Sequence, residues 1–160
     1  MKPVITKNFL PADQYYSLKK ELHDSHFPWY FNDFSVNKGT HHQFTHTFYR
    51  DGKITSDFFS LIEPILKIIN PKTLLRVKLN LNAQTSSMIE TGMHIDVNND
   101  LAVSSVLFFN TCDGYVRFEN GSPIYSEDNK LVTFKSNERH TGSTTTNKKR
   151  RLVLNLMYNV

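Results

Sequence analysis

Hydrophobic and polar residues follow two different periods along this chain, and the change falls near residue 74. Before it, apolar side chains recur three or four positions apart, as they do along one face of a helix. Leu18 and Leu22 show this spacing within residues 11–23, which predicts a first helix. A longer stripe predicts a second helix over residues 56–69, formed by Phe58, Leu61, Ile62, Ile65 and Ile69.

From Leu74 onward the period becomes two, which is typical of a half-buried strand. Apolar and polar positions alternate here as Leu75, Val77, Leu79 and Leu81 against Arg76, Lys78, Asn80 and Asn82. Asn120-Gly121 favours a hairpin turn. Further strands are predicted over residues 101–109, 115–119, 123–125, 131–134 and 152–158. Short strands joined by turns indicate a mainly β fold, a sandwich or barrel with flanking helices.

The length of 160 residues suits one compact domain, with helical N-terminal support over about residues 1–73 and a β core over about residues 74–160. A hydrophobic content of 39% with 21% charged residues excludes a disordered chain. The net charge of +4 is mild, so it is compatible with an anionic ligand or a nucleic acid and requires neither.

The single cysteine, Cys112, excludes an internal disulfide and a cysteine-based zinc site. It favours a reducing compartment, and we expect a cytoplasmic protein. Met1 to Phe9 lacks the apolar segment of a signal peptide. No apolar run approaches the roughly 20 residues of a membrane span, so no membrane partner is expected.

The segment His94-Ile95-Asp96 brings together two residue types that bind metals. In a strand, residues i and i+2 point to the same side, so His94 and Asp96 would project together. One more histidine would complete the two-histidine, one-carboxylate set that holds non-haem Fe(II). Because His-x-Asp is a short pattern, a surface turn leading into Asn98-Asn99-Asp100 is the alternative reading.

The C-terminal segment supplies both a histidine and a cation. His140 precedes the last predicted strand, in which Arg151, Val153 and Asn155 share one face. An arginine on the polar face of a core strand needs an anionic partner, because an unpaired buried guanidinium is costly. A carboxylate held by two parallel hydrogen bonds is the natural partner.

These pieces resemble the 2-oxoglutarate–Fe(II) oxygenase superfamily, and most of all its small prolyl-4-hydroxylase-like members. The similarity covers about residues 75–158, in the order usual for that family. The matching segments are Arg76-Val-Lys-Leu-Asn80, Gly92-Met-His94-Ile-Asp96, Asp113-Gly114-Tyr115, Phe118-Glu-Asn-Gly121, Asn129-Lys-Leu-Val-Thr-Phe134, His140-Thr-Gly142 and Arg150-Arg151-Leu-Val-Leu-Asn155.

The resemblance implies a double-stranded β-helix, or jelly roll, with Fe(II) at His94, Asp96 and His140. It implies 2-oxoglutarate and dioxygen as co-substrates, with Arg151 at the distal carboxylate of 2-oxoglutarate and Arg150 as the rival. Asn80 and Asn155 are expected as further contacts to the co-substrate. No catalytic residue is expected beyond the metal ligands, because the cofactor carries the chemistry.

The resemblance leaves the primary substrate and the oligomeric state open. A peptide is the expected substrate by analogy, through a prolyl residue, and a small molecule is the other choice. Two other functions stay open: a nucleic-acid oxidative demethylase, and a jelly-roll binding module without catalysis.

Aromatic and histidine residues cluster ahead of the β core. We expect residues 32–46 to form a mobile lid at the mouth of the site, with His41, His42 and His46 as polar lid residues rather than a second metal site. Trp29 and Tyr30 are expected in the core.

Overall fold

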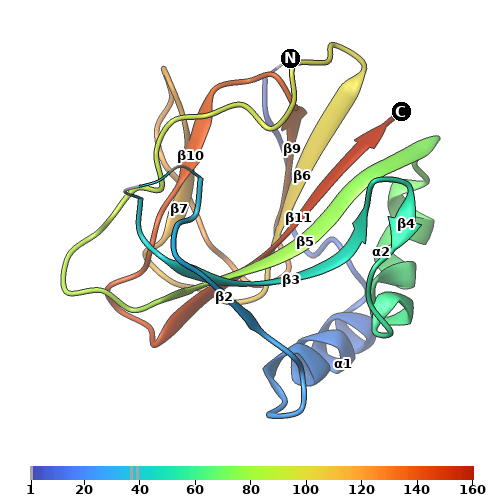
Figure 1. Ribbon diagram of the computed structural model, residues 1–160, viewed down its shortest axis with the longest axis horizontal. Helices are drawn as coiled ribbons and strands as arrows, with labels where there is room; N and C mark the ends of the chain where they lie inside the picture. The colour runs from blue at the N-terminus through green and yellow to red at the C-terminus, as the bar shows by residue number, and fades with distance from the viewer. Residues whose placement is uncertain (1, 37, 39) are drawn as a thin grey trace.

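The computed structural model describes residues 2–36, 38 and 40–160, so Met1, Asn37 and Gly39 lie outside the described residues. Two antiparallel sheets face each other, and the helices lie outside the larger sheet (Figure 1). This arrangement confirms the predicted mainly β fold with flanking helices. The elements are β1 Val4–Thr6, α1 Ala12–His23, β2 Tyr30–Asn32, β3 Gln43–Arg50, β4 Lys53–Ile54, the 3₁₀ turn η1 Phe59–Ile62, α2 Glu63–Ile69, β5 Thr73–Ala83, β6 Ala102–Phe108, β7 Tyr115–Phe118, β8 Ile124–Tyr125, β9 Leu131–Lys135, β10 His140–Gly142 and β11 Arg150–Asn159.

The strand order is that of a jelly roll. The larger sheet runs β1-β9-β6-β11-β5-β3-β2, with β4 paired to β3, and the smaller sheet runs β10-β7-β8. From β6 onward the chain passes back and forth between the two sheets, with β6, β9 and β11 in the larger sheet and the β7–β8 hairpin and β10 in the smaller one. This alternation confirms the double-stranded β-helix.

The central strand β11 pairs with β5 on one side and with β6 on the other. Its even-numbered leucines pack into the core beneath the helices, whereas Arg151, Val153 and Asn155 face the space between the sheets. The alternation read from the sequence is therefore correct for this strand, and it separates an apolar face from a face that lines a cavity.

Two apolar clusters hold the layers together. The larger lies between the helices and the large sheet and includes Tyr15, Leu18 and Leu22 of α1. The smaller lies between the two sheets around Phe108, Phe118, Phe134 and their valine neighbours. None of the helices in the described part of the chain is long and apolar enough to cross a membrane.

The second predicted helix is interrupted. Residues 56–58 form a turn, Phe59–Ile62 is a 3₁₀ helix, and the α-helix begins only at Glu63. Pro64 lies in the first turn of α2, where its missing N–H leaves no hydrogen bond unmade, but a continuous helix through this point would lose one. The prediction of one helix over residues 56–69 was therefore only partly right.

The first 73 residues also contribute strands that the sequence pattern did not predict. The longest, β3, pairs with β5 and widens the large sheet. Asp51 and Gly52 follow it with φ of 53° and 76°, as a two-residue hairpin turn requires. The predicted hairpin at Asn120-Gly121 is confirmed by the pairing of β7 with β8, although the connection is longer and Gly121 donates a backbone hydrogen bond to Phe118.

Candidate metal centre and co-substrate cavity

A cavity of about 200 Å³ lies between the two sheets. This volume is below the roughly 300–1,000 Å³ of pockets that hold drug-sized ligands, so the cavity suits a small molecule or one end of a larger one. All six residues predicted as metal or co-substrate contacts line it, namely Asn80, His94, Asp96, His140, Arg151 and Asn155.

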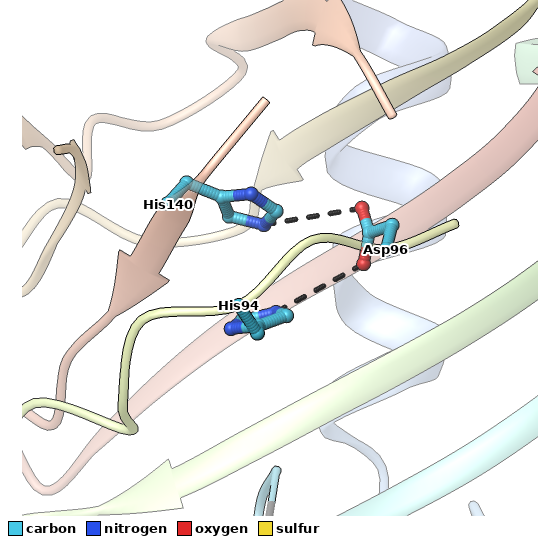
Figure 2. Close-up of side chains that lie close together, drawn as sticks. All are labelled: His94, Asp96 and His140. Carbon is cyan, nitrogen blue, oxygen red and sulfur yellow. Dashed lines mark ion pairs between the residues drawn. The ribbon is translucent and has the colours of Figure 1, made fainter. Parts of the chain in front are cut away.

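His94, Asp96 and His140 point toward one another at one place on the cavity wall (Figure 2). Their potential ligand atoms all lie within 4.8 Å of one another. His94 Nε2 is 4.0 Å from Asp96 Oδ1, and His140 Nε2 is 3.9 Å from Asp96 Oδ2. Two imidazole nitrogens and a carboxylate oxygen in such a cluster can occupy three neighbouring positions around one metal ion.

Both histidines are oriented by backbone carbonyls. His94 Nδ1 lies 2.9 Å from the carbonyl oxygen of Gly92, and His140 Nδ1 lies 2.9 Å from that of Glu138. A carbonyl only accepts, so each Nδ1 carries the proton and each Nε2 keeps a lone pair for a metal. Burial lowers the pKa of His140, which keeps its ring neutral. Both rings are therefore in the tautomer that a metal ligand needs, and the His140 ring is also in the neutral state.

Asp96 is oriented by partners on the large sheet. Ser104 Oγ of β6 donates to Asp96 Oδ2 at 2.6 Å and is itself 2.8 Å from Ser136 Oγ. Arg76 Nη2 of β5 lies 3.5 Å from Asp96 Oδ1. Hydrogen bonds of this kind fix the direction of a ligating carboxylate and tune its affinity for a metal.

The backbone that carries His94 and Asp96 is not a regular strand, contrary to the expectation from the sequence. His94 and His140 exchange two backbone hydrogen bonds of 2.9 Å, and the next bond from this segment runs from Asp96 N to the carbonyl oxygen of Ser136. A regular antiparallel ladder would pair Asp96 with Glu138, so the bond to Ser136 shows that the ladder does not continue. The two side chains share one side of the segment nevertheless, because the bonds at His94 and Asp96 hold both residues against β10 and its preceding turn.

Arg151 is buried, with 2% of its surface exposed. Its Nε donates to Ser126 Oγ at 2.8 Å and its Nη1 donates to the carbonyl oxygen of Ser143 at 3.2 Å. Nη2 is also buried and has no hydrogen-bond partner among the described residues. Burial lowers the pKa of Arg151 to about 10, so the group remains charged at neutral pH. A buried cation with free N–H groups facing a cavity is the feature that an anionic ligand satisfies.

Arg150 faces elsewhere. It lies with Lys148 and Lys149 along a surface groove against α1 and does not line the central cavity. The register of β11 against β5 places Arg151 opposite Asn82, which does line the cavity. The geometry therefore favours Arg151 over its neighbour as the contact to a ligand in the cavity.

Three asparagines add unpaired amide groups to the same wall. The Oδ1 atoms of Asn80, Asn82 and Asn155 are buried and lack hydrogen-bond partners in the described part of the chain. Asn80 and Asn82 are not solvated strand positions, because these residues are 7% and 3% exposed. Rotation of an amide by 180° would instead present its N–H groups to a carboxylate.

Sequence reasoning missed two cations in the cavity, Arg76 and Lys78. Both belong to the polar face of β5 that also carries Asn80, so the period-two pattern did contain the signal. Burial and the neighbouring Arg76 lower the pKa of Lys78 to about 8. No hydrogen bond or ion pair of Lys78 Nζ is present among the described residues, so its charge is unpaired.

The predicted lid is partly at the cavity. Ser35, Val36 and Gln43 line it, whereas Asn37 and Gly39 of the same stretch lie outside the described residues. His46 is a buried residue rather than a lid residue, since its Nδ1 and Nε2 contact the Pro28 carbonyl oxygen and Ser56 Oγ. Tyr30 is 62% exposed at a sheet edge, so its prediction as a core residue was wrong. Trp29 packs against the core, as expected.

Comparison with solved structures identifies the fold. A prolyl-4-hydroxylase of Pseudomonas putida superposes with a TM-score of 0.68 at 17% identity, covering 99% of this chain and 92% of that one. A prolyl hydroxylase of Trichoplax adhaerens, solved with a peptide fragment of hypoxia inducible factor, gives 0.67 at 15% identity over 98% and 83%. The chain has the fold of the 2-oxoglutarate–Fe(II) oxygenases.

The same fold serves other chemistry in further similar structures. The α-ketoglutarate-dependent epimerase SnoN of nogalamycin biosynthesis superposes with a TM-score of 0.69 at 13% identity, covering 98% of this chain and 78% of that one. No protein-family model and no curated protein matches this chain by sequence. Because these identities are low, the comparisons establish the fold, and the function has to be argued from the site.

Proposed function

We propose that this protein is an Fe(II)- and 2-oxoglutarate-dependent oxygenase that hydroxylates a C–H bond of its substrate. One observation carries the proposal. A cluster of two histidines and one carboxylate, with both Nε2 atoms free, shares a small cavity with a buried arginine whose Nη2 lacks a partner. A jelly roll with only a structural role needs neither feature.

The residues fit the metal. His94, Asp96 and His140 offer two imidazole nitrogens and one carboxylate oxygen, which suits Fe(II) and leaves coordination positions open. The Gly92 and Glu138 carbonyls hold both rings in the required tautomer, and Ser104 holds the carboxylate. Bound Fe(II), with 2-oxoglutarate and dioxygen, supplies an oxidant strong enough to insert one oxygen atom into a C–H bond.

The residues also fit the co-substrate. Arg151 binds the distal carboxylate of 2-oxoglutarate, since Nη2 is free and faces the cavity. Ser126 and Ser143 hold the guanidinium in place, so the carboxylate meets a donor that is already oriented. Asn80 and Asn155 flank the path between Arg151 and the metal cluster and contact the body of the same molecule.

The primary substrate is a peptide or a small molecule. Two similar structures are prolyl hydroxylases, and one of them holds a peptide, which makes a peptidyl proline one candidate. The basic run of Lys148, Lys149 and Arg150, which is compatible with a nucleic acid, lies on a groove away from the cavity and adds no contact there. A binding module could use the unpaired Nη2 of Arg151 to hold an anion, but it would have no need of the metal-ligand set of His94, Asp96 and His140.

Succinate formation from 2-oxoglutarate in the presence of Fe(II) tests the proposal. The wild-type protein is expected to form succinate slowly without substrate and faster with a hydroxylatable one, which gains the mass of one oxygen. His94→Ala and Asp96→Ala should both abolish the Fe(II)-dependent reaction. Full activity in either variant would exclude the metal assignment.

A further inference from the structure

We infer that the primary substrate carries an anionic group, a carboxylate or a phosphate, that binds to Lys78 together with Arg76. This rests on the proposed function, since it names the chemistry of the substrate that the same cavity takes. Neither cation belongs to the predicted co-substrate contacts, and only Arg76 contacts the metal-ligand cluster, through Asp96 Oδ1 at 3.5 Å.

The charges in the cavity do not balance without such a group. Arg76, Lys78 and Arg151 line it, and Asp96 is the only acidic residue among the described residues that do. A divalent metal adds two positive charges, and 2-oxoglutarate brings two negative ones. Two positive charges then remain uncompensated within the cavity, and such a cavity attracts an anionic ligand. An anionic substrate removes this imbalance.

Position along the strands separates these cations from the co-substrate arginine. In the register of β5 against β11, Arg151 lies opposite Asn82, Lys78 lies opposite Asn155, and Arg76 lies opposite Met157. Lys78 and Arg76 thus lie four and six residues along β5 from Asn82, the residue opposite Arg151. The cavity therefore has one cation near its Arg151 end and two toward its other end.

The Asp96 carboxylate of the metal-ligand cluster lies toward the end that holds the two cations. Ser104, which donates to Asp96, is opposite Met157 in the pairing of β6 with β11, at the level of Arg76. In the proposed binding mode, one carboxylate of 2-oxoglutarate would be held at the metal-ligand cluster and the other at Arg151. Neither carboxylate is then left for Lys78 or Arg76, and the group that pairs with them comes from another molecule.

The hydrogen-bonding state of both side chains agrees with this. Lys78 Nζ has no partner within the described chain, and Arg76 Nε is buried without one. Arg76 does approach Asp96, at 3.5 Å, but a carboxylate that also binds a divalent metal has little charge left to neutralise a guanidinium. Lys78 Nζ and the unpaired Nε of Arg76 can therefore hold an anion beside the metal-ligand cluster, close to where the C–H bond to be oxidised must lie.

NMR of lysine labelled with ¹³C at Cε tests the inference directly. The protein is loaded with Zn(II), which does not turn over, and with 2-oxoglutarate, and is then titrated with acetate, inorganic phosphate or neutral acetamide. The Lys78 signal, assigned through Lys78→Met, is expected to move saturably with acetate or phosphate and not with acetamide. Comparison of the two anions distinguishes a carboxylate from a phosphate group. The signal of Lys72, an exposed lysine just before β5, should not move.

Two outcomes would overturn the inference. The first is a Lys78 signal that responds to the anions no more than Lys72 does. The second is a Lys78 signal that moves fully on addition of 2-oxoglutarate and then ignores both anions, because the co-substrate would itself occupy Lys78. The experiment involves no turnover and is repeated without metal, so a protein that forms no succinate but still binds the anion at Lys78 would refute only the proposed function.

A second measurement uses variants. Phosphate or acetate should raise the melting temperature of the wild type and of Lys72→Met, because a ligand that binds only the folded state stabilises it. Lys78→Met should raise the anion concentration needed for half of this effect at least tenfold, and Lys78→Arg should restore it within threefold. An unchanged response in Lys78→Met would contradict the inference whatever the basal stability of that variant.

Discussion

Gly114 and Arg151 pack so closely that no side chain larger than hydrogen fits between them. A Cβ atom at Gly114 would lie 2.3 Å from Arg151 Cδ and 2.5 Å from the carbonyl oxygen of Thr144. The backbone of the loop before β7 therefore packs directly against the aliphatic part of the buried Arg151 side chain. This contact explains, in physical terms, a glycine that the sequence offered only as part of the Asp113-Gly114-Tyr115 motif.

Gly114→Ala should therefore weaken binding of 2-oxoglutarate through Arg151. The new methyl group must displace either the arginine stem or the Thr144 backbone, and such overpacking costs about 1–3 kcal/mol. We expect the KM for 2-oxoglutarate to rise about tenfold or more, measured by succinate formation. Gly121→Ala is the control, because the nearest atoms to its Cβ stand at an ordinary 3.5 Å. Equal effects of the two substitutions would contradict this explanation.

Arg151→Met removes the proposed partner of the distal carboxylate. A charge-assisted hydrogen bond contributes about 1.5–3 kcal/mol, so the KM for 2-oxoglutarate should rise about 10- to 100-fold. Arg150→Met is the matched neighbour, and its KM should stay within twofold of wild type because Arg150 faces a surface groove. If the two variants exchanged effects, Arg150 would be the co-substrate contact.

The sequence predicted the residues of the site better than the backbone that holds them. The period of two placed Arg151 and Asn155 on one face and the leucines of β11 on the other, because side-chain alternation depends on local geometry alone. His94 and Asp96 came together as expected, although their segment is irregular. Bonds to His140 and Ser136 set that segment, and contacts with residues about 40 positions away leave no mark on a local pattern.

The two cations of β5 are residues of the cavity that the sequence alone could not assign to it. The alternating pattern identifies Arg76 and Lys78 as polar positions, but this pattern is the same whether the polar face of the strand contacts water or lines a cavity. Only the smaller sheet, which packs opposite, makes that face an interior one. Likewise Tyr30 lies at the end of the large sheet rather than in its middle, and strand order is decided by long-range pairing.

Ser104→Ala should weaken metal binding without removing a ligand. Ser104 Oγ donates to Asp96 Oδ2 at 2.6 Å, and loss of such a partner typically costs 10- to 100-fold in metal affinity. Competition with a chelator measures this effect on the Fe(II) or Zn(II) dissociation constant. Ser105→Ala is the control, since the neighbouring hydroxyl bonds Thr133 and Tyr158 instead and is equally buried. A similar loss of affinity in both variants would point to general destabilisation of β6.

Because of Asp113, the free energy of unfolding should depend on pH in the acidic range. It accepts hydrogen bonds from Thr145 Oγ1 and from the backbone N–H and hydroxyl of Thr146, in the loop that leads into β11. Burial acts to raise the pKa of Asp113, but these hydrogen bonds outweigh it and lower the pKa from 3.8 to about 2. Because the folded pKa lies below the unfolded one, the carboxylate contributes stability above about pH 4 and loses it as the pH falls toward 2.

Melting temperatures of the wild type and Asp113→Asn between pH 2 and pH 7 measure this contribution. The variant should melt lower than the wild type at pH 5–7, and the difference should shrink between pH 4 and pH 2 as the wild-type carboxylate takes up its proton. Asp57→Asn is the control, because Asp57 is exposed and makes no hydrogen bond or ion pair among the described residues. A difference for Asp113→Asn that stays constant down to pH 2 would show that its effect is steric. In that case the charge of the Asp113 carboxylate would not be what stabilises the loop that leads into β11.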